Sequence, residues 1–257
     1  MPTAATLRLE IERSLQHRFP SALTPEQRTV CEVAPTGIEE VDALLDGGLP
    51  VGAISEITGA QSSGRTSLAL AFVAQRTRDE QVCAWVDVSD ALDPESAAAS
   101  GVALPKLLWI RCRDAGTQAK GKGSNGKPWS RLDQAVRATD LLLQAGGFAA
   151  IVLDLGDTAP EHASRIPLAT WFRFRQAAHR ARTCLVVLGQ DAYAQSSAAA
   201  VLECTQRHEA IAGETVLDGL RFEVVRQRQR SLQMTTGKKP PASVWPARGA
   251  WNAVRRA

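Results

Sequence analysis

The feature that most constrains this chain is a short loop bounded by two glycines. Residues 59–67 read Gly-Ala-Gln-Ser-Ser-Gly-Arg-Thr-Ser, after a segment (53–58) that predicts a strand and before one (66–78) that predicts a helix. Glycines let consecutive backbone N–H groups turn toward one anion, and the helix N-terminus adds a partial positive charge. The loop fits the phosphate-binding pattern G-x-x-x-x-G-K-[ST], except that Arg65 stands where lysine belongs. It therefore predicts a strand–loop–helix unit with a phosphate-binding ancestry.

Strands and helices are expected to alternate along the rest of the chain. Continuous apolar runs such as 149–155 are typical of strands buried on both faces of a sheet. A later segment, 220–225, alternates apolar and charged residues, which favours an antiparallel strand with one wet face. The other expected strands are 82–88, 107–112 and 184–188, and the expected helices are 131–145 and 166–181. We predict an α/β fold with a mostly parallel central sheet, helices on both faces and antiparallel strands toward the C-terminus.

Composition narrows the class of protein. The chain has 257 residues, 44% hydrophobic and 22% charged, which suits a globular protein rather than a disordered one. It has no apolar run of the ~18 residues that a membrane span needs, and residues 1–12 lack the apolar core of a signal peptide. The five cysteines are scattered without a C-x-x-C pair, so neither disulfides nor a zinc site are expected. We expect a cytoplasmic protein.

The charge of the chain is unevenly distributed. Residues 161–257 contain 15 Lys and Arg against 7 Asp and Glu, whereas residues 1–160 contain 15 against 20. A basic C-terminal part predicts that any contact with a polyanion is made there. A solvated, arginine-rich surface explains the same counts, and charge alone leaves the two alternatives open.

We expect three parts: a helical arm and linker (1–34), a core (35–236) and a basic tail (237–257). In the arm, a short helix over 7–16 carries a narrow apolar stripe, which favours docking on another surface. In the tail, Trp245 and Trp251 could stack on bases or pack on the core, and packing is the favoured alternative.

Several short segments together resemble one family. They are 47–50 (GGLP), the loop 59–67, 83–87 (CAWVD), 91–94 (ALDP), 152–154 (VLD), 185–190 (LVVLGQ) and 222–228 (FEVVRQR). In order and spacing they resemble the core of RecA, over about residues 7–245. Because RecA's additional C-terminal domain has no counterpart here, the chain most resembles the short RecA-like accessory proteins of the ImuA type, from bacterial mutagenesis operons.

This resemblance implies a nucleotide site. Thr66 would ligate Mg²⁺, Asp154 would belong to the Walker B strand, and Gln190 would sense the γ-phosphate. Arg226 and Arg228 would reach the nucleotide of a neighbouring subunit. The residues expected to bind nucleotide are Gly59, Gly64, Arg65, Thr66, Ser67, Asp93, Asp154 and Gln190.

Three departures from the RecA pattern predict a degenerate ATPase. Arg65 is longer and forked, so it does not replace the compact lysine in positioning a transition state. Ser89 stands in place of the glutamate that activates water, and a serine lacks a basic carboxylate. Ser96 removes the aromatic side chain that stacks on adenine. We therefore expect no catalytic residue, and ATP with Mg²⁺ as at most a weakly bound cofactor.

The segments that align with the DNA-binding loops of RecA are also changed. The first, 157–167, is short, and the second, 191–200, consists of small residues with little charge, so a filament around DNA is not expected. Weak DNA binding remains an expectation because basic side chains recur at seven-residue spacing on the predicted helix, as 173 with 180 and 175 with 182. The candidate DNA-binding residues are Arg173, Arg175, Arg180, Arg182 and Arg230.

By resemblance, the chain would be an adaptor in SOS translesion synthesis and mutagenesis. Its expected partners are an ImuB-type inactive Y-family polymerase homologue, an error-prone replicative-type polymerase and RecA, with no membrane contact. One alternative is a DNA-dependent ATPase or recombinase, in which Arg65 acts on phosphate and Asp90 or Asp154 assists hydrolysis. Another is a RecA-fold inhibitor of cell division.

Overall fold

The structure is a computed structural model that describes residues 32–113, 130–156, 158–212, 217–229 and 241–248. The predicted helix over 7–16, Trp251 and Arg230 lie outside the described residues.

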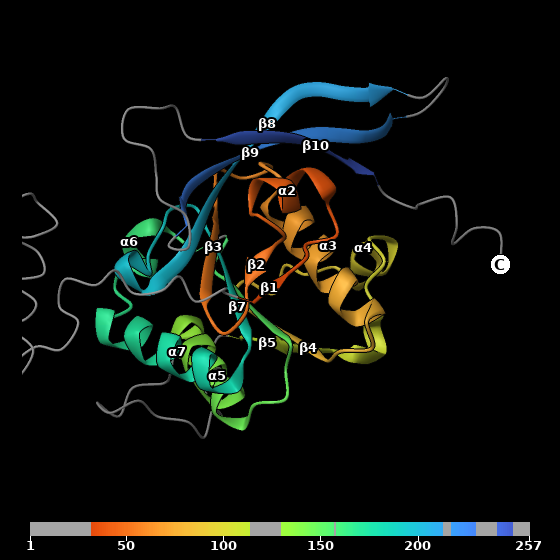
Figure 1. Ribbon diagram of the computed structural model, residues 1–257. Coiled ribbons are helices and arrows are strands. Elements are labelled where there is room, and N and C mark those ends of the chain that lie inside the picture. The colour runs from red at the N-terminus through yellow and green to blue at the C-terminus, as the bar shows by residue number, and fades with distance from the viewer. Residues whose placement is uncertain (1–31, 114–129, 157, 213–216, 230–240, 249–257) are drawn as a thin grey trace, which may run out of the picture. The chain divides into compact units, whose positions relative to one another are not determined.

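Within the described residues, eight strands form one central sheet in the order β10-β9-β8-β3-β7-β6-β4-β5 (Figure 1). Neighbours from β8 to β5 pair in parallel, whereas β8 with β9 and β9 with β10 pair antiparallel. The strands are β3 (Ile54–Thr58), β4 (Cys83–Asp87), β5 (Leu107–Arg111), β6 (Ala150–Asp154), β7 (Cys184–Gly189), β8 (Ala198–Ala212), β9 (Leu217–Gln229) and β10 (Ala242–Arg248). The predicted fold class is confirmed.

Helices cover both faces of this sheet, which gives two buried apolar clusters. The cluster on one face includes Leu68 and Phe72 of α3, and the cluster on the other includes Leu143 of α5 and Trp171 of α7. The helices are α2 (Glu39–Leu44), α3 (Arg65–Arg78), α4 (Pro94–Ala99), α5 (Arg131–Ala145), α6 (Pro160–Ala163) and α7 (Leu168–Ala181), and β1 (Val33–Ala34) pairs with β2 (Leu49–Pro50) apart from the main sheet.

The central strands are buried along their whole length, as their apolar sequences predict. All five residues of β3 and of β4 are buried, and so are the first four of β6. Strands that receive helices on both faces must be apolar throughout, because neither face meets water. The parallel arrangement brings the carboxyl ends of β3, β4, β6 and β7 to one edge, where the loops of the candidate site begin.

Two strands differ from the sequence-based expectation. β8 begins at Ala198, inside the segment 191–200 that was expected to be a loop, since its small side chains carry no strand signal of their own. β10 occupies part of the segment expected to be a basic tail. Its Trp245 is 3% exposed and packs on Phe222 with ring centroids 5.4 Å apart, so the favoured packing alternative is confirmed for Trp245.

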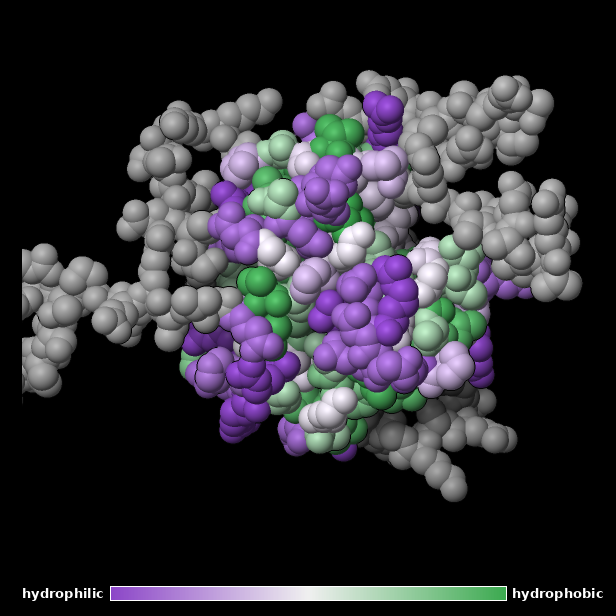
Figure 2. Space-filling view, turned by 45° about the vertical axis from the view of Figure 1, so that its right-hand side comes forward, coloured by the Kyte–Doolittle hydropathy of each residue, from purple (hydrophilic) through white to green (hydrophobic). Residues whose placement is uncertain are grey.

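On the face seen in Figure 2, hydrophilic side chains surround separate apolar patches. Among the described residues, no helix has both the length and the apolar character that a membrane crossing requires.

Candidate nucleotide site at the carboxyl edge of the sheet

The loop between β3 and α3 requires glycine at both ends. Gly59 and Gly64 have φ values of +146° and +94°, which residues other than glycine rarely adopt. A Cβ atom at Gly59 would lie 2.3 Å from the carbonyl oxygen of Cys204, and one at Gly64 would lie 2.5 Å from Cγ of Phe222. Strands β8 and β9 therefore pack against the loop. The positive φ values of its two glycines are those that the motif predicts.

Arg65, the unusual residue of the loop, is buried at the N-terminus of the 14-residue helix α3. The residue is only 7% exposed, and its Nη1 atom has no hydrogen-bond partner among the described residues. The hydroxyl of the neighbouring Ser63 is also buried and has no hydrogen-bond partner in the described part of the chain. A buried guanidinium nitrogen without a hydrogen-bond partner destabilises the fold, and an anion in the loop would compensate it. The residues present thus fit a phosphate group.

Asp154, at the end of β6, and Gln190, directly after β7, lie near the same loop. Asp154 is half-buried, and its Oδ1 accepts a hydrogen bond of 2.9 Å from the backbone N–H of Gly156. Gln190 donates from Nε2 to the Gly156 carbonyl at 3.4 Å, and its own carbonyl accepts from Gly59 N–H at 3.2 Å. A Cβ at Gly156 would lie 3.6 Å from Nη2 of Arg65. Gly156, which sequence reasoning missed, therefore lies where the elements of the site meet.

Thr66 and Ser67 occupy the first turn of α3, where Thr66 is exposed and Ser67 is half-buried. The Thr66 hydroxyl and the Asp154 carboxylate are oxygen ligands of the kind that Mg²⁺ prefers. They could hold Mg²⁺ together with a bound phosphate.

The carboxylate that ends β4 holds the chain's own backbone. Asp87 is 1% exposed and accepts hydrogen bonds from the N–H groups of Ala91 (3.1 Å) and Leu92 (2.9 Å). It also accepts from Nε1 of Trp109 at 3.2 Å. These three bonds fix the turn from β4 toward α4, on which the half-buried Ser89 lies.

Asp90, which follows Ser89 in the sequence, is paired with Arg111. It has φ +59° and accepts two hydrogen bonds from Arg111, one from Nε and one from Nη2 at 2.7 Å. The hydrogen bond from Arg111 holds the pKa of Asp90 below its ordinary value, which makes this carboxylate a weaker base. This pairing gives no support to Asp90 as an assistant in hydrolysis.

Asp93, expected to bind nucleotide, caps helix α4. It accepts a hydrogen bond of 2.6 Å from the Ser96 hydroxyl and one of 2.9 Å from the Ser96 N–H. The hydrogen bond from the Ser96 hydroxyl lowers the pKa of Asp93. Ser96, which replaces the aromatic residue of the RecA pattern, thus completes the cap.

The two arginines expected to reach a neighbouring subunit bond to their own chain. Nη1 of Arg226 donates to the Leu44 carbonyl at 2.7 Å and to Oε1 of Gln229 at 3.2 Å. Arg228 donates to the carbonyls of Gln195 and Ala198, the latter at 3.2 Å. Both guanidinium groups tie β9 to neighbouring elements, and an inter-subunit role stays a prediction.

The arginines of α7 only partly share one face. Arg173 pairs with Asp140 at 3.0 Å, and Arg180 is exposed on the last turn. Arg182 lies beyond the helix, as its C-cap with φ +53°, and pairs with Glu32. The predicted alignment of Arg175 with Arg182 is wrong, because the helix ends at Ala181 and the chain turns there.

A buried carboxylate that the motifs did not identify connects β3 to the loop after β7. Glu56 is 1% exposed, and its Oε1 accepts hydrogen bonds from the N–H groups of Tyr193 (2.6 Å) and Ala194 (2.8 Å). Oε2 has no partner among the described residues. Burial raises the pKa of Glu56, against the lowering effect of these bonds and of Arg228. An acidic residue inside an otherwise apolar strand is the sequence signal that could have revealed Glu56.

The sheet order and the glycine loop define a P-loop α/β core of the RecA type. Comparison with known proteins agrees, since residues 5–122 match the RecA N-terminal domain. Protein RecA of Arthrobacter sp. (strain FB24) is 38% identical over 133 residues, which are 51% of this chain and 33% of that protein. Protein RecA of Mesorhizobium japonicum is 32% identical over 180 residues, or 64% of this chain and 45% of that protein. The chain thus spans less than half the length of these relatives.

A solved structure shares the fold beyond the matched domain. The crystal structure of the RadB recombinase aligns with 83% of this chain and 96% of its own, with a TM-score of 0.58 and 14% identity. The RecA-like fold is therefore shared over 83% of the chain, whereas the family match covers residues 5–122.

Proposed function

We propose that this protein is a RecA-like accessory factor in DNA-damage-induced translesion synthesis, acting in the cytoplasm as an adaptor rather than as an ATPase. One observation carries the proposal. The phosphate loop keeps its geometry and a buried arginine whose Nη1 has no hydrogen-bond partner among the described residues, whereas the carboxylates at the end of β4 and after it hold the protein's own fold and Ser89 has no carboxylate. Such a site can bind an anion but has no group after β4 that activates water.

ATP with Mg²⁺ fits the site as a ligand with a structural role. The loop N–H groups and Arg65 would hold phosphate oxygens, and Thr66 with Asp154 would hold the ion. When bound, the nucleotide supplies negative charge beside the buried guanidinium. Gln190 and Gly156 would then connect its occupancy to the backbone after β6.

The relatives support a role in DNA transactions, because they are RecA proteins and a structure described as a recombinase. The expected partners are an inactive Y-family polymerase homologue of the ImuB type, an error-prone replicative-type polymerase and RecA. Weak, salt-sensitive DNA contact through the basic C-terminal third would accompany these interactions.

The test is deletion of the gene, followed by three measurements after DNA damage. The adaptor predicts a fall of about tenfold or more in induced mutation frequency, with recombination frequency and cell length unchanged. Loss of recombination would instead favour the recombinase, and altered filamentation would favour the division inhibitor. An unchanged mutation frequency would overturn the proposal.

A further inference from the structure

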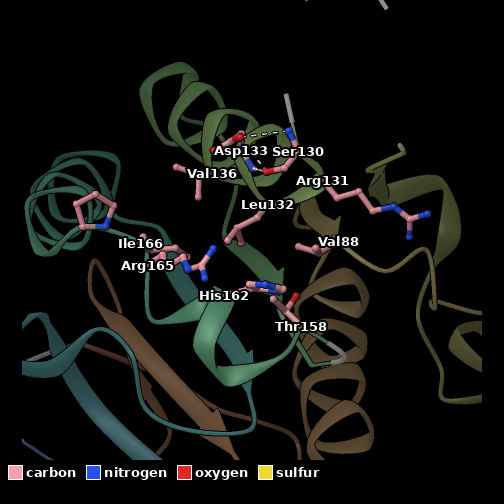
Figure 3. A pocket seen from close by; sticks show the side chains of 11 residues that line it. Val88, Ser130, Arg131, Leu132, Asp133, Val136, Thr158, His162, Arg165 and Ile166 are labelled. Carbon is pink, nitrogen blue, oxygen red and sulfur yellow. Dashed lines mark hydrogen bonds between the residues drawn. The ribbon is translucent and has the colours of Figure 1, made fainter. Parts of the chain in front are cut away.

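A cavity of about 570 Å³ lies at the same edge of the sheet, on the side covered by α5 and α6 (Figure 3). Val88 after β4, Leu132 and Val136 of α5, and Ile166 before α7 give it aliphatic walls. In Figure 3, Leu132 faces His162 and Thr158, and the side chain of Arg165 points toward the same space. The cavity therefore has aliphatic side chains on one side and the basic side chains of Arg165 and His162 on the other.

The charge of this cavity is not balanced from within. Its acidic residue, Asp133, belongs to the N-terminal capping box of α5, where Oδ2 accepts from the Ser130 hydroxyl at 2.8 Å and from its N–H at 3.1 Å. Among the described residues, none forms an ion pair with the side chains of Arg165 or His162. An entering carboxylate would complement them.

The lining favours a protein segment over a nucleic acid. Single-stranded DNA and RNA are bound by aromatic side chains that stack on bases and by cations that follow the phosphates. Here the described lining has no Phe, Tyr or Trp, and its apolar part is aliphatic. Aliphatic pockets with a few polar groups hold apolar anchors and fix their orientation.

Apolar surface continues beside the cavity. Pro167 lines it, and Leu168 follows directly at the start of α7, 56% exposed. Phe172, one turn later on the same helix, is 51% exposed. Exposed apolar surface next to a pocket is typical of sites for protein partners.

We propose that this cavity receives an aliphatic side chain from a partner protein, with an adjacent carboxylate of that partner bound by Arg165 and His162. Leu132, Val136 and Ile166 would contact the aliphatic group. The inference goes beyond the adaptor role because it names the surface and the chemistry of the partner, and it does not require an occupied phosphate loop.

The smallest probe of this chemistry is N-acetyl-leucine, titrated into the full-length ¹⁵N-labelled protein and followed by backbone amide shifts. We expect the shifts to gather on the residues around Leu132 and His162, with a dissociation constant in the low millimolar range for so small a ligand. N-acetyl-leucine amide, which lacks the carboxylate, should bind about fivefold more weakly or worse. Arg165→Gln should remove that difference, whereas Arg78→Gln, exposed on α3, should preserve it.

Val136→Asp tests the apolar wall independently and should abolish binding of the probe. Arg165→Gln should leave the protein folded. The proposal is overturned if N-acetyl-leucine shows no binding at concentrations up to about 20-fold above the expected dissociation constant. It is also overturned if the acid and the amide bind equally. It is also overturned if a 20-residue oligothymidylate shifts the same amides and Arg165→Gln weakens that effect. If the probe fails while deletion still lowers induced mutagenesis, only the cavity assignment falls.

Discussion

The loop after β3 and the loop after β4 lie at the same edge of the sheet, but their polar groups have different partners. In the β3 loop, Arg65 Nη1 and the Ser63 hydroxyl are buried without partners among the described residues. In the β4 loop, Asp87, Asp90 and Asp93 all accept hydrogen bonds from their own chain. The first loop has room for an anion beside its unpartnered groups, and the second stabilises the local fold. We therefore propose that binding and hydrolysis are separable properties of this site.

The largest expected effect concerns hydrolysis. By resemblance to RecA, we expect Arg65 and Ser89 to replace the phosphate-bridging cation and the water-activating base, and each such group contributes on the order of 10²-fold or more to rate. We expect ATP turnover close to background, about 10⁴-fold below that of an intact site, in a steady-state phosphate-release assay with single-stranded DNA. Thr66→Ala is the matched control. Robust DNA-stimulated ATP turnover that Thr66→Ala abolishes would show that the site hydrolyses ATP, and the proposed separation of binding from hydrolysis would be wrong.

The second prediction concerns the structural role of the β4 carboxylate. Asp87→Ala leaves the N–H groups of Ala91 and Leu92 and the indole of Trp109 without their acceptor. A buried donor without a partner costs about 1–3 kcal/mol. Because only the Leu92 N–H bond is buried and the other two are part-buried, we expect a loss of roughly 2–3 kcal/mol in the free energy of unfolding. Urea denaturation measures it. Glu40→Ala, at an exposed carboxylate on α2, should change it by less than about 0.5 kcal/mol.

The two loops also differ in how well sequence reasoning anticipated them. The β3 loop was predictable because its geometry follows from residues adjacent in the chain, Gly59 and Gly64, and the motif records both. The roles of Asp87 and Asp90 were not predictable, since their partners Trp109 and Arg111 come from another strand. Their pairing depends on β5 lying beside β4.

Sheet order explains the other residues that were missed. Phe222 packs on Gly64 and Glu56 binds the backbone of Tyr193 across more than 130 residues of sequence, contacts that only the assembled sheet creates. The fold itself was predictable because continuous apolar strands such as β4 and β6 can be satisfied only inside a covered parallel sheet. The start of β8 lacked that signal, since Ala198 and its neighbours are small.

The third prediction sharpens the binding half of the comparison. Inorganic phosphate should stabilise the wild-type protein through Arg65, by about 1.4 kcal/mol at ten times its dissociation constant, which differential scanning calorimetry would record as a rise of a few degrees in Tm. Arg65→Met should abolish this dependence on phosphate without lowering the Tm in the absence of phosphate, because it removes a buried guanidinium group whose Nη1 has no hydrogen-bond partner among the described residues. Equal phosphate dependence in the variant would place the bound anion elsewhere.

The smallest expected effect concerns Glu56, which connects the phosphate-loop strand to the loop after β7. Burial raises the pKa of Glu56 above its ordinary value of 4.5, so the folded protein binds this proton more tightly than the unfolded chain does. The stabilisation that follows is complete below pH 4.5 and is lost as the pH rises through the raised pKa. Glu56→Gln cannot titrate, yet its amide oxygen can still accept from Tyr193 and Ala194. The unfolding free energy of the wild type relative to this variant should therefore fall between pH 4 and pH 8 in urea denaturation, with Glu95→Gln, exposed on α4, as the control for general pH effects. A relative stability that rises with pH would mean that the hydrogen bonds from Ala194 and Tyr193, together with Arg228, outweigh the effect of burial on Glu56.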